Sequence, residues 1–182
     1  ILATFLLLAG LSPVGAAPEK PTPIIKGSKT ASGYHGTVDI WSTPGTRQAA
    51  GSFRHGKPDG RWTFWDETGV KVAELTYTNG TFTGPVTLWH GAHAGPREKG
   101  RLKYRGAFND GEWSGLALTY YPDGRTRSER QYEGGAVRET VAFDPRGNPL
   151  SPEQANQVAA EDEEQENAYV DALDAYVLRW VQ

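Results

Sequence analysis

The fold of this chain is decided by residues 56–80, GKPDGRWTFWDETGVKVAELTYTNG. Residues 61–65 and 70–77 are rich in aromatic and β-branched side chains, which is typical of short β-strands. Residues 66–69 between them are turn formers, and Asn79-Gly80 tolerates the positive φ that a second chain reversal requires. The stretch therefore predicts a β-hairpin that leads directly into the next strand.

The hairpin recurs along the chain with a period of 24 residues, interrupted by one insertion of seven. Four unit glycines have spacings of 24, 24 and 31 residues: Gly36, Gly60, Gly84 and Gly115. An aromatic residue follows each of them after five positions: Trp41, Trp65, Trp89 and Tyr120. A second aromatic series includes the same insertion: Phe53, Tyr77, Phe108 and Tyr132. A degraded copy without the glycine covers residues 137–147. The chain is therefore a β-hairpin repeat.

These units resemble the variant MORN repeat (membrane occupation and recognition nexus) of bacterial exported and antitoxin-like proteins. The resemblance covers residues 33–147 and is carried by residues 56–80 and 109–124, NDGEWSGLALTYYPDG. It implies an all-β repeat of tandem β-hairpins in one elongated, twisted antiparallel sheet. For function it implies scaffolding, protein interaction or lipid contact rather than catalysis.

Strand parity separates the side chains into two faces. One face is apolar and is expected to form the core: Val38, Ile40, Trp62, Phe64, Val86, Leu88, Ala117 and Thr119. The other face is mixed and carries an aromatic ladder: Trp41, Trp65, Trp89 and Tyr120. The ladder has two interpretations, namely packing between repeats and a recognition surface for a peptide, glycan or lipid headgroup.

Composition changes at both ends of the repeat domain, which we place at residues 33–150. Residues 1–16 resemble a cleavable signal peptide, which predicts a periplasmic or secreted protein. Residues 17–32 are rich in Pro, Lys, Ser and Thr and are expected to form a linker, with Ile24-Ile25 as a possible short edge strand.

Residues 151–182 are expected to form an acidic amphipathic helix, because Ser151-Pro152-Glu153 is a good helix start. This tail has eight acidic residues against one basic residue. An aromatic and aliphatic stripe follows helical spacing: Tyr169, Leu173, Tyr176, Val177 and Trp180. The stripe predicts either a cap on the repeat sheet or, through Tyr176 and Trp180, a partner-binding helix. Residues 161–166 are expected to be a solvated face or a break in the helix.

The insertion contains five alternating basic residues: Arg97, Lys99, Arg101, Lys103 and Arg105. An extended chain would place all five on one side, where they could meet anionic lipid or an acidic protein. The alternatives are a solvated edge and a docking site for the acidic tail. His90 and His93 in the same insertion are too few for a convincing metal site.

Composition excludes several chemistries and leaves binding as the expected function. The 182 residues carry a net charge of −3 and no Cys, so thiolate metal sites and cysteine nucleophiles are excluded. No nucleotide-binding or nucleophile-elbow motif occurs, and Asp59 and Glu67 are better explained as turn residues than as general bases. We therefore expect a non-enzymatic exported scaffold for protein interaction, without cofactor, metal or nucleic acid. The alternative is a cell-envelope binding module that contacts glycan or anionic lipid through the ladder and the basic insertion.

Overall fold

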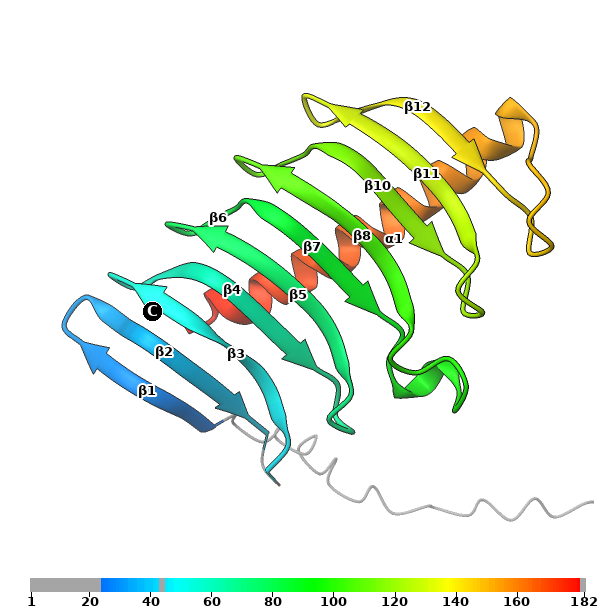
Figure 1. The fold of residues 1–182 in the computed structure, drawn as a ribbon. Helices are drawn as coiled ribbons and strands as arrows, with labels where there is room; N and C mark the ends of the chain where they lie inside the picture. The colour runs from blue at the N-terminus through cyan, green and yellow to red at the C-terminus, as the bar shows by residue number, and fades with distance from the viewer. Residues whose placement is uncertain (1–23, 43–44, 181–182) are drawn as a thin grey trace, which may run out of the picture.

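The computed structural model describes residues 24–42 and 45–180, which form one open antiparallel sheet with a long helix across one face (Figure 1). The predicted signal peptide lies outside the described residues. The strands are β1 (Ile24–Thr30), β2 (Gly33–Trp41), β3 (Arg47–Arg54), β4 (Lys57–Trp65), β5 (Lys71–Thr78), β6 (Thr81–Phe82), β7 (Gly84–Trp89), β8 (Leu102–Asn109), β9 (Glu112–Trp113), β10 (Gly115–Tyr120), β11 (Thr126–Glu133) and β12 (Ala136–Ala142). The helices are the short 3₁₀ turn η1 (Ala92–Ala94) and α1 (Pro152–Leu178).

The sheet follows the order of the chain, β1-β2-β3-β4-β5-β7-β8-β10-β11-β12, with β6 paired to β5 and β9 paired to β8. Every pairing between strands is antiparallel. This meander confirms the predicted tandem β-hairpins, elongated sheet and C-terminal helical cap.

Tight turns connect one repeat to the next at equivalent positions. Both residues of each turn have positive φ: His55-Gly56, Asn79-Gly80, Asp110-Gly111 and Gly134-Gly135. Two successive positive φ values define the turn whose twist matches that of the flanking strands. At the opposite end of the hairpins, two turns use carboxylates: Asp66 Oδ1 accepts hydrogen bonds from the backbone N–H groups of Thr68 and Val70, and Asp123 Oδ1 accepts one from that of Arg125.

A β-bulge recurs once in each repeat, on the return strand of the hairpin. Trp65 pairs with Lys71 while Phe64 pairs with Ala73, which leaves Val72 without a partner across the strand pair. The same shift occurs in the other three hairpins and leaves one extra residue in each: Gln48, Lys103 and Arg127. A bulge places two residues opposite one and redirects the extra side chain.

The core lies on the face that strand parity assigned to it. All eight residues that we expected in the core are buried. An aromatic chain runs through the core across the repeats, with ring centroids 3.8–6.5 Å apart: Tyr34, Phe53, Trp62, Tyr77, Phe82, Phe108, Trp113 and Tyr132. Gly51 lies against the Trp62 ring, where a Cβ would come within 2.2 Å of a ring atom. The second aromatic series of the sequence therefore packs one repeat onto the next.

Helix α1 crosses the apolar face of the sheet from β12 back towards β3 (Figure 1). Its start is a capping box, in which the Ser151 hydroxyl accepts from Gln154 N and the Gln154 side chain accepts from Ser151 N. One stripe of the helix is buried: Ala155, Ala159, Asp162, Glu166, Val170 and Val177. The expected break at residues 161–166 is wrong, because the helix is continuous there. The expected solvated face is correct only in part, since Glu161 and Glu164 are exposed whereas Asp162 and Glu166 are buried.

Two further expectations need correction. Residues 24–30 of the predicted linker form edge strand β1, which is longer than the two-residue strand considered for Ile24-Ile25. The basic insertion is not extended before Leu102, because η1 and a series of turns occupy residues 92–100. Its glycines and Pro96 favour turns over a strand. Within the described part of the chain, no helix is both long and apolar enough to cross a membrane.

Candidate functional site

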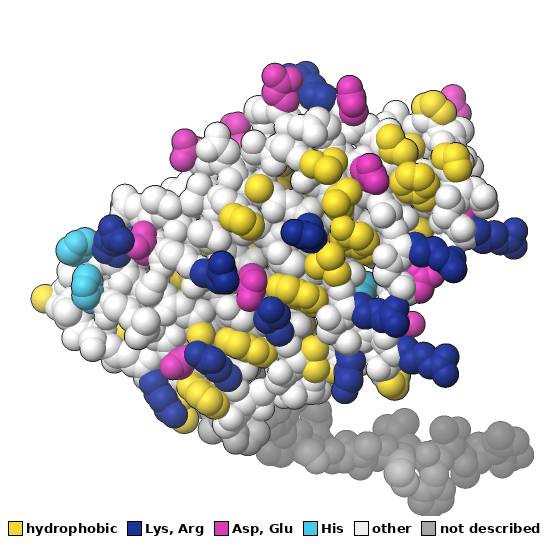
Figure 2. All heavy atoms as spheres, viewed as in Figure 1, with side chains coloured by type: hydrophobic (Ala, Val, Ile, Leu, Met, Phe, Trp, Pro, Cys, Tyr) yellow, Lys and Arg dark blue, Asp and Glu magenta, His cyan; other side chains and the backbone are white. Residues whose placement is uncertain are grey.

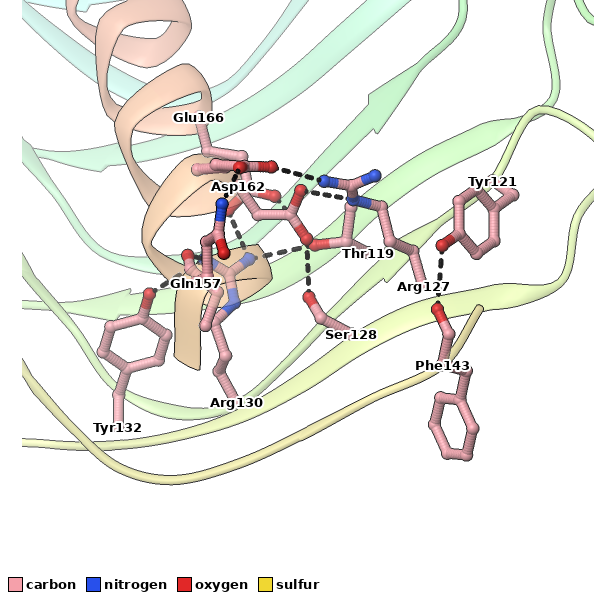
Figure 3. A network of polar contacts seen from close by, with 12 residues as sticks. Thr119, Tyr121, Arg127, Ser128, Arg130, Tyr132, Phe143, Gln157, Asp162 and Glu166 are labelled. Atoms are coloured by element: carbon pink, nitrogen blue, oxygen red, sulfur yellow. Dashed lines mark hydrogen bonds and ion pairs between the residues drawn. The ribbon is translucent and has the colours of Figure 1, made fainter. Parts of the chain in front are cut away.

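A network of charged and hydroxyl side chains joins the N-terminal half of α1 to the inner face of β10 and β11 (Figure 3). Arg130 is fully buried and Glu166 is 3% exposed. Arg130 Nη2 donates to Glu166 Oε2 at 2.5 Å and to Thr119 Oγ1 at 3.0 Å. Thr119 Oγ1 in turn donates to Glu166 Oε1 at 2.9 Å. These contacts fix one position of the helix on the sheet.

Burial changes the acid–base properties of this pair. Loss of hydration raises the pKa of Glu166 to about 7, although the Arg130 guanidinium pulls it downward. Loss of hydration by itself would lower the pKa of Arg130, but the Glu166 carboxylate more than offsets this and the pKa is raised. Arg130 therefore keeps its charge, while Glu166 titrates near neutral pH.

A second acid–base pair lies one turn earlier on the helix. Asp162 accepts from Arg127 Nε and from Ser128 Oγ, each at 2.7 Å. Arg127 also contacts Glu161, at 3.2 Å. The acidic tail therefore docks on the sheet through Arg127 and Arg130, not on the insertion as one of our alternatives proposed.

The bulge residues line the path of the helix. Gln48 accepts a hydrogen bond from the Tyr176 hydroxyl at 2.8 Å, and Lys103 Nζ lies 5.8 Å from the centre of the Tyr169 ring. Arg127 is the bulge residue that binds Asp162. The bulges thus supply an additional row of helix contacts that strict strand alternation would have turned outward.

The C-terminal half of α1 is held mainly by apolar packing. Val170 and Val177 are buried, and Tyr176 and Trp180 are half-buried against the core. Tyr77 adds a hydrogen bond from its hydroxyl to Asp174 at 3.0 Å. Both tail candidates for partner binding, Tyr176 and Trp180, therefore contribute to the internal interface.

The opposite face of the sheet carries an alternating ladder of cations and Trp rings. Lys26 Nζ lies 4.6 Å from the centre of the Trp41 ring. The Arg47 guanidinium lies 4.7 Å from Trp65, and Lys71 Nζ lies 3.9 Å from Trp89. The six residues occupy the successive sheet positions β1, β2, β3, β4, β5 and β7. Figure 2 shows Lys and Arg side chains interleaved with hydrophobic ones on this face. We call these six residues the outer ladder.

Two of the three cations of the outer ladder are also paired with carboxylates. Arg47 pairs with Asp39, and Lys71 Nζ lies 3.2 Å from Glu74 Oε1. The Arg47 and Lys71 side chains remain 41% and 40% exposed. Beside them is a shallow polar hollow over β2–β5, whose lining includes the small residues Ala50, Gly51 and Ser52. The ladder is thus half-buried, positioned by its neighbours and open to solvent along one side.

The ladder ends at Trp89. The position equivalent to Arg47 and Lys71 in the next repeat is Leu102, which pairs with Trp89 across the strands. Tyr120 lies on the same face and is half-buried, but the described residues place no cation over its ring. All four aromatic residues therefore lie on the face that the sequence predicted. The cation–π contacts of the outer ladder involve three of them.

The five basic residues of the insertion do not form a common stripe. Arg97 and Lys99 lie in turns, and Arg101 Nη1 donates to the Asp123 carbonyl at 2.7 Å. Lys103 is directed to the helix side by its bulge, whereas Arg105 is exposed. The one-sided cationic surface expected from the sequence is absent from these described residues because the chain turns at 92–100.

The histidines of the insertion also have local partners. His93 Nε2 lies 2.5 Å from Glu67 Oε1 on the surface. Burial and the nearby Lys103 lower the pKa of His90. No group of three or more His, Asp or Glu residues suited to a metal ion occurs within residues 24–42 and 45–180.

Comparison with known proteins found no matching family and no similar curated protein. Sequence reasoning missed the cations of the outer ladder, although Arg47 and Lys71 are one 24-residue period apart. It also missed the inward acids of α1, whose partners Arg127 and Arg130 showed no periodic signal.

Proposed function

We propose that this protein is a non-enzymatic, exported repeat scaffold of the MORN type, and that it binds a protein partner on the outer face of its sheet. The observation that carries the proposal is the difference between the two faces of the sheet, of which only one is covered by the helix. Helix α1 occupies the apolar face and uses its own acids and aromatic residues to do so. The outer ladder is left uncovered by the described residues.

The composition of the outer ladder supports a binding role. Trp and Arg are enriched among the residues that contribute most to the binding energy of protein interfaces. Three Trp rings in one row give this face more apolar surface than the solvent-facing side of a sheet requires. The cations within 4.7 Å of their centres restrict the motion of the rings, so the surface is preorganised before a partner arrives.

A cell-envelope glycan is the second candidate, favoured by the polar hollow beside the ladder. Its lining offers Asp39, Arg61, Thr63 and Glu74 as hydrogen-bonding groups next to the Trp65 ring. The anionic-lipid version of this alternative loses the support that a continuous basic stripe in the insertion would have provided.

Site-specific photo-crosslinking tests the proposal. A photoreactive phenylalanine analogue would replace the exposed Arg61 on the outer face or, as a control, the exposed Glu164 on the helix. After irradiation in cells that naturally make the protein, mass spectrometry would identify the adducts. We expect one discrete protein adduct from position 61 and none from position 164. Equal labelling from both positions, or no protein adduct, would contradict the proposal.

A further inference from the structure

The outer ladder has a regular spacing across the strands. Its cations lie on β1, β3 and β5, and its Trp rings lie on β2, β4 and β7. Neighbouring strands are about 4.8 Å apart, so groups of one kind recur every ~9.6 Å along a line perpendicular to the strands. A ligand that uses every rung must present equivalent groups at the same interval.

Among regular peptide conformations, polyproline II fits this interval best. It has three residues per turn and rises about 3.1 Å per residue, so every third side chain returns to the same side after ~9.3 Å. A β-strand repeats its side chains on one face about every 6.6 Å. An α-helix repeats every ~5.4 Å. Over three rungs, polyproline II stays within about 1 Å of the ladder.

The side chains of the ladder specify the chemistry of that peptide. Lys26, Arg47 and Lys71 present positive charge at each rung, and Arg61 adds a fourth cation at the adjoining hollow. The nearby carboxylates, Asp39 and Glu74, are fewer than these cations and already pair with two of them. Aromatic-lined surfaces bind proline-rich segments in polyproline II conformation. The surface is therefore complementary to a peptide that has both acidic residues and prolines.

We propose that the outer ladder binds an acidic, proline-rich segment of the partner protein in polyproline II conformation, which lies across the strands and offers one carboxylate to each cation. This inference rests on the proposed function and identifies the class of partner. Because polyproline II is already extended and restricted, the segment loses little conformational entropy on binding.

The test uses the full chain and a fluorescent peptide of repeated Glu-Pro-Pro triplets, about 12 residues long, which spans three rungs. Fluorescence anisotropy would measure its affinity at low and moderate salt. We expect saturable binding that weakens as salt rises. A peptide of repeated Lys-Pro-Pro triplets should not bind. A peptide of the same composition as the first, with its glutamates adjacent, should bind about tenfold more weakly, because only one rung can then be matched.

Two variants of equal charge locate the site. Arg47→Gln with Lys71→Gln should weaken binding of the Glu-Pro-Pro peptide about tenfold or more, whereas Arg97→Gln with Lys99→Gln should leave the affinity unchanged. Arg47 and Lys71 are half-buried whereas Arg97 and Lys99 are exposed, so unfolding curves would verify that both variants fold. Lys71→Gln alone serves as a milder variant if the first pair proves unstable.

Several outcomes would overturn the inference. These are equal loss of affinity in the insertion variant, equal binding of the peptide with adjacent glutamates, and no binding to the wild-type chain. Chitin oligosaccharides that bind in place of the acidic peptide would favour the glycan candidate. A protein adduct from position 61 without peptide binding would overturn this inference and leave the proposed function standing.

Discussion

At the scale of the residue, the Arg130–Glu166 pair is the most demanding feature of the interior. Both side chains are buried, and the Thr119 hydroxyl forms a hydrogen bond with each of them. Buried ion pairs gain little net stability over apolar residues but are costly to break, because the remaining charge is left without a partner. We infer that this pair fixes the position of α1 on the sheet.

The titration of Glu166 predicts that stability decreases as pH rises. Its pKa is raised from the ordinary value of 4.5 to about 7, so the folded state holds this proton more tightly than the unfolded state. The contribution of Glu166 to the free energy of unfolding is therefore fully present below pH 4.5. It is lost as the pH rises through 7, and the loss is ~3 kcal/mol at most. Urea unfolding between pH 5 and 8 would measure it.

The matched variant for this prediction is Glu166→Gln, which cannot titrate. The unfolding free energy of the wild type, minus that of the variant, should fall as pH rises. Asp66 and Asp144, whose pKa values are lowered by hydrogen bonds, remain in both proteins, so their effect on the pH dependence cancels in the difference. A difference that stays constant from pH 5 to 8 would show that Glu166 does not titrate in this range.

At the scale of the element, the repeat is a hairpin with a built-in bulge, and α1 is a helix with a strong start. The bulge explains how one strand can serve both faces, since Lys71 lies in the outer ladder while the adjacent Val72 is buried on the helix side. The start of α1 depends on the capping box of Ser151 and Gln154. The bulge and the capping box are both local features, yet both determine how the helix packs on the sheet.

Removal of the cap should destabilise the first turn of α1. Ser151→Ala loses the acceptor for Gln154 N and should cost about 1 kcal/mol of unfolding free energy. Amide hydrogen exchange in residues 153–158 should accelerate more than exchange in the core strands. Ser151→Asp keeps an acceptor at the same position and should retain wild-type exchange. Equal exchange in Ser151→Ala and the wild type would mean that tertiary contacts alone hold this turn.

At the scale of the whole molecule, the sheet has one face closed by its own helix and one face open. The hairpins form a single layer, so each repeat needs its neighbours and α1 to bury its apolar side chains. Helix α1 contributes Val170 and Val177 to this core. Within residues 24–42 and 45–180, the outer ladder is left uncovered.

Removal of residues 151–182 should therefore expose the apolar face. Burial of an aliphatic side chain such as Val170 or Val177 stabilises the fold by about 1.5–3 kcal/mol, and this contribution would be lost along with the ionic network. We expect the shortened chain to bind a hydrophobic dye and to self-associate in sedimentation experiments. The full chain with Glu153→Gln and Glu164→Gln, which changes only exposed acids, should remain unchanged. A monomeric, dye-free shortened chain would contradict the role of α1 as a cap.

Much of the architecture could be predicted from residues alone. The unit glycines and the two aromatic series predicted the hairpins, their order and the apolar face, because turn chemistry and side-chain alternation act over a few residues. The helix start at Ser151 was equally local. The four ladder aromatics were placed on the correct face for the same reason.

The remainder depends on contacts between residues far apart in the chain. Asp162 and Glu166 resembled solvated acids, because their partners Arg127 and Arg130 lie more than 30 residues away in the sequence. The basic insertion was misjudged because alternation of charge does not reveal whether a segment is extended.

The repeat, its turns, its two faces and the C-terminal helix can all be predicted from the order of residues, since each follows from preferences within a single hairpin or helical turn. Only the tertiary contacts show which acids are buried and which cations lie over the Trp rings. A bulge changes the direction of a side chain, and a buried charge is tolerated only where a distant partner meets it.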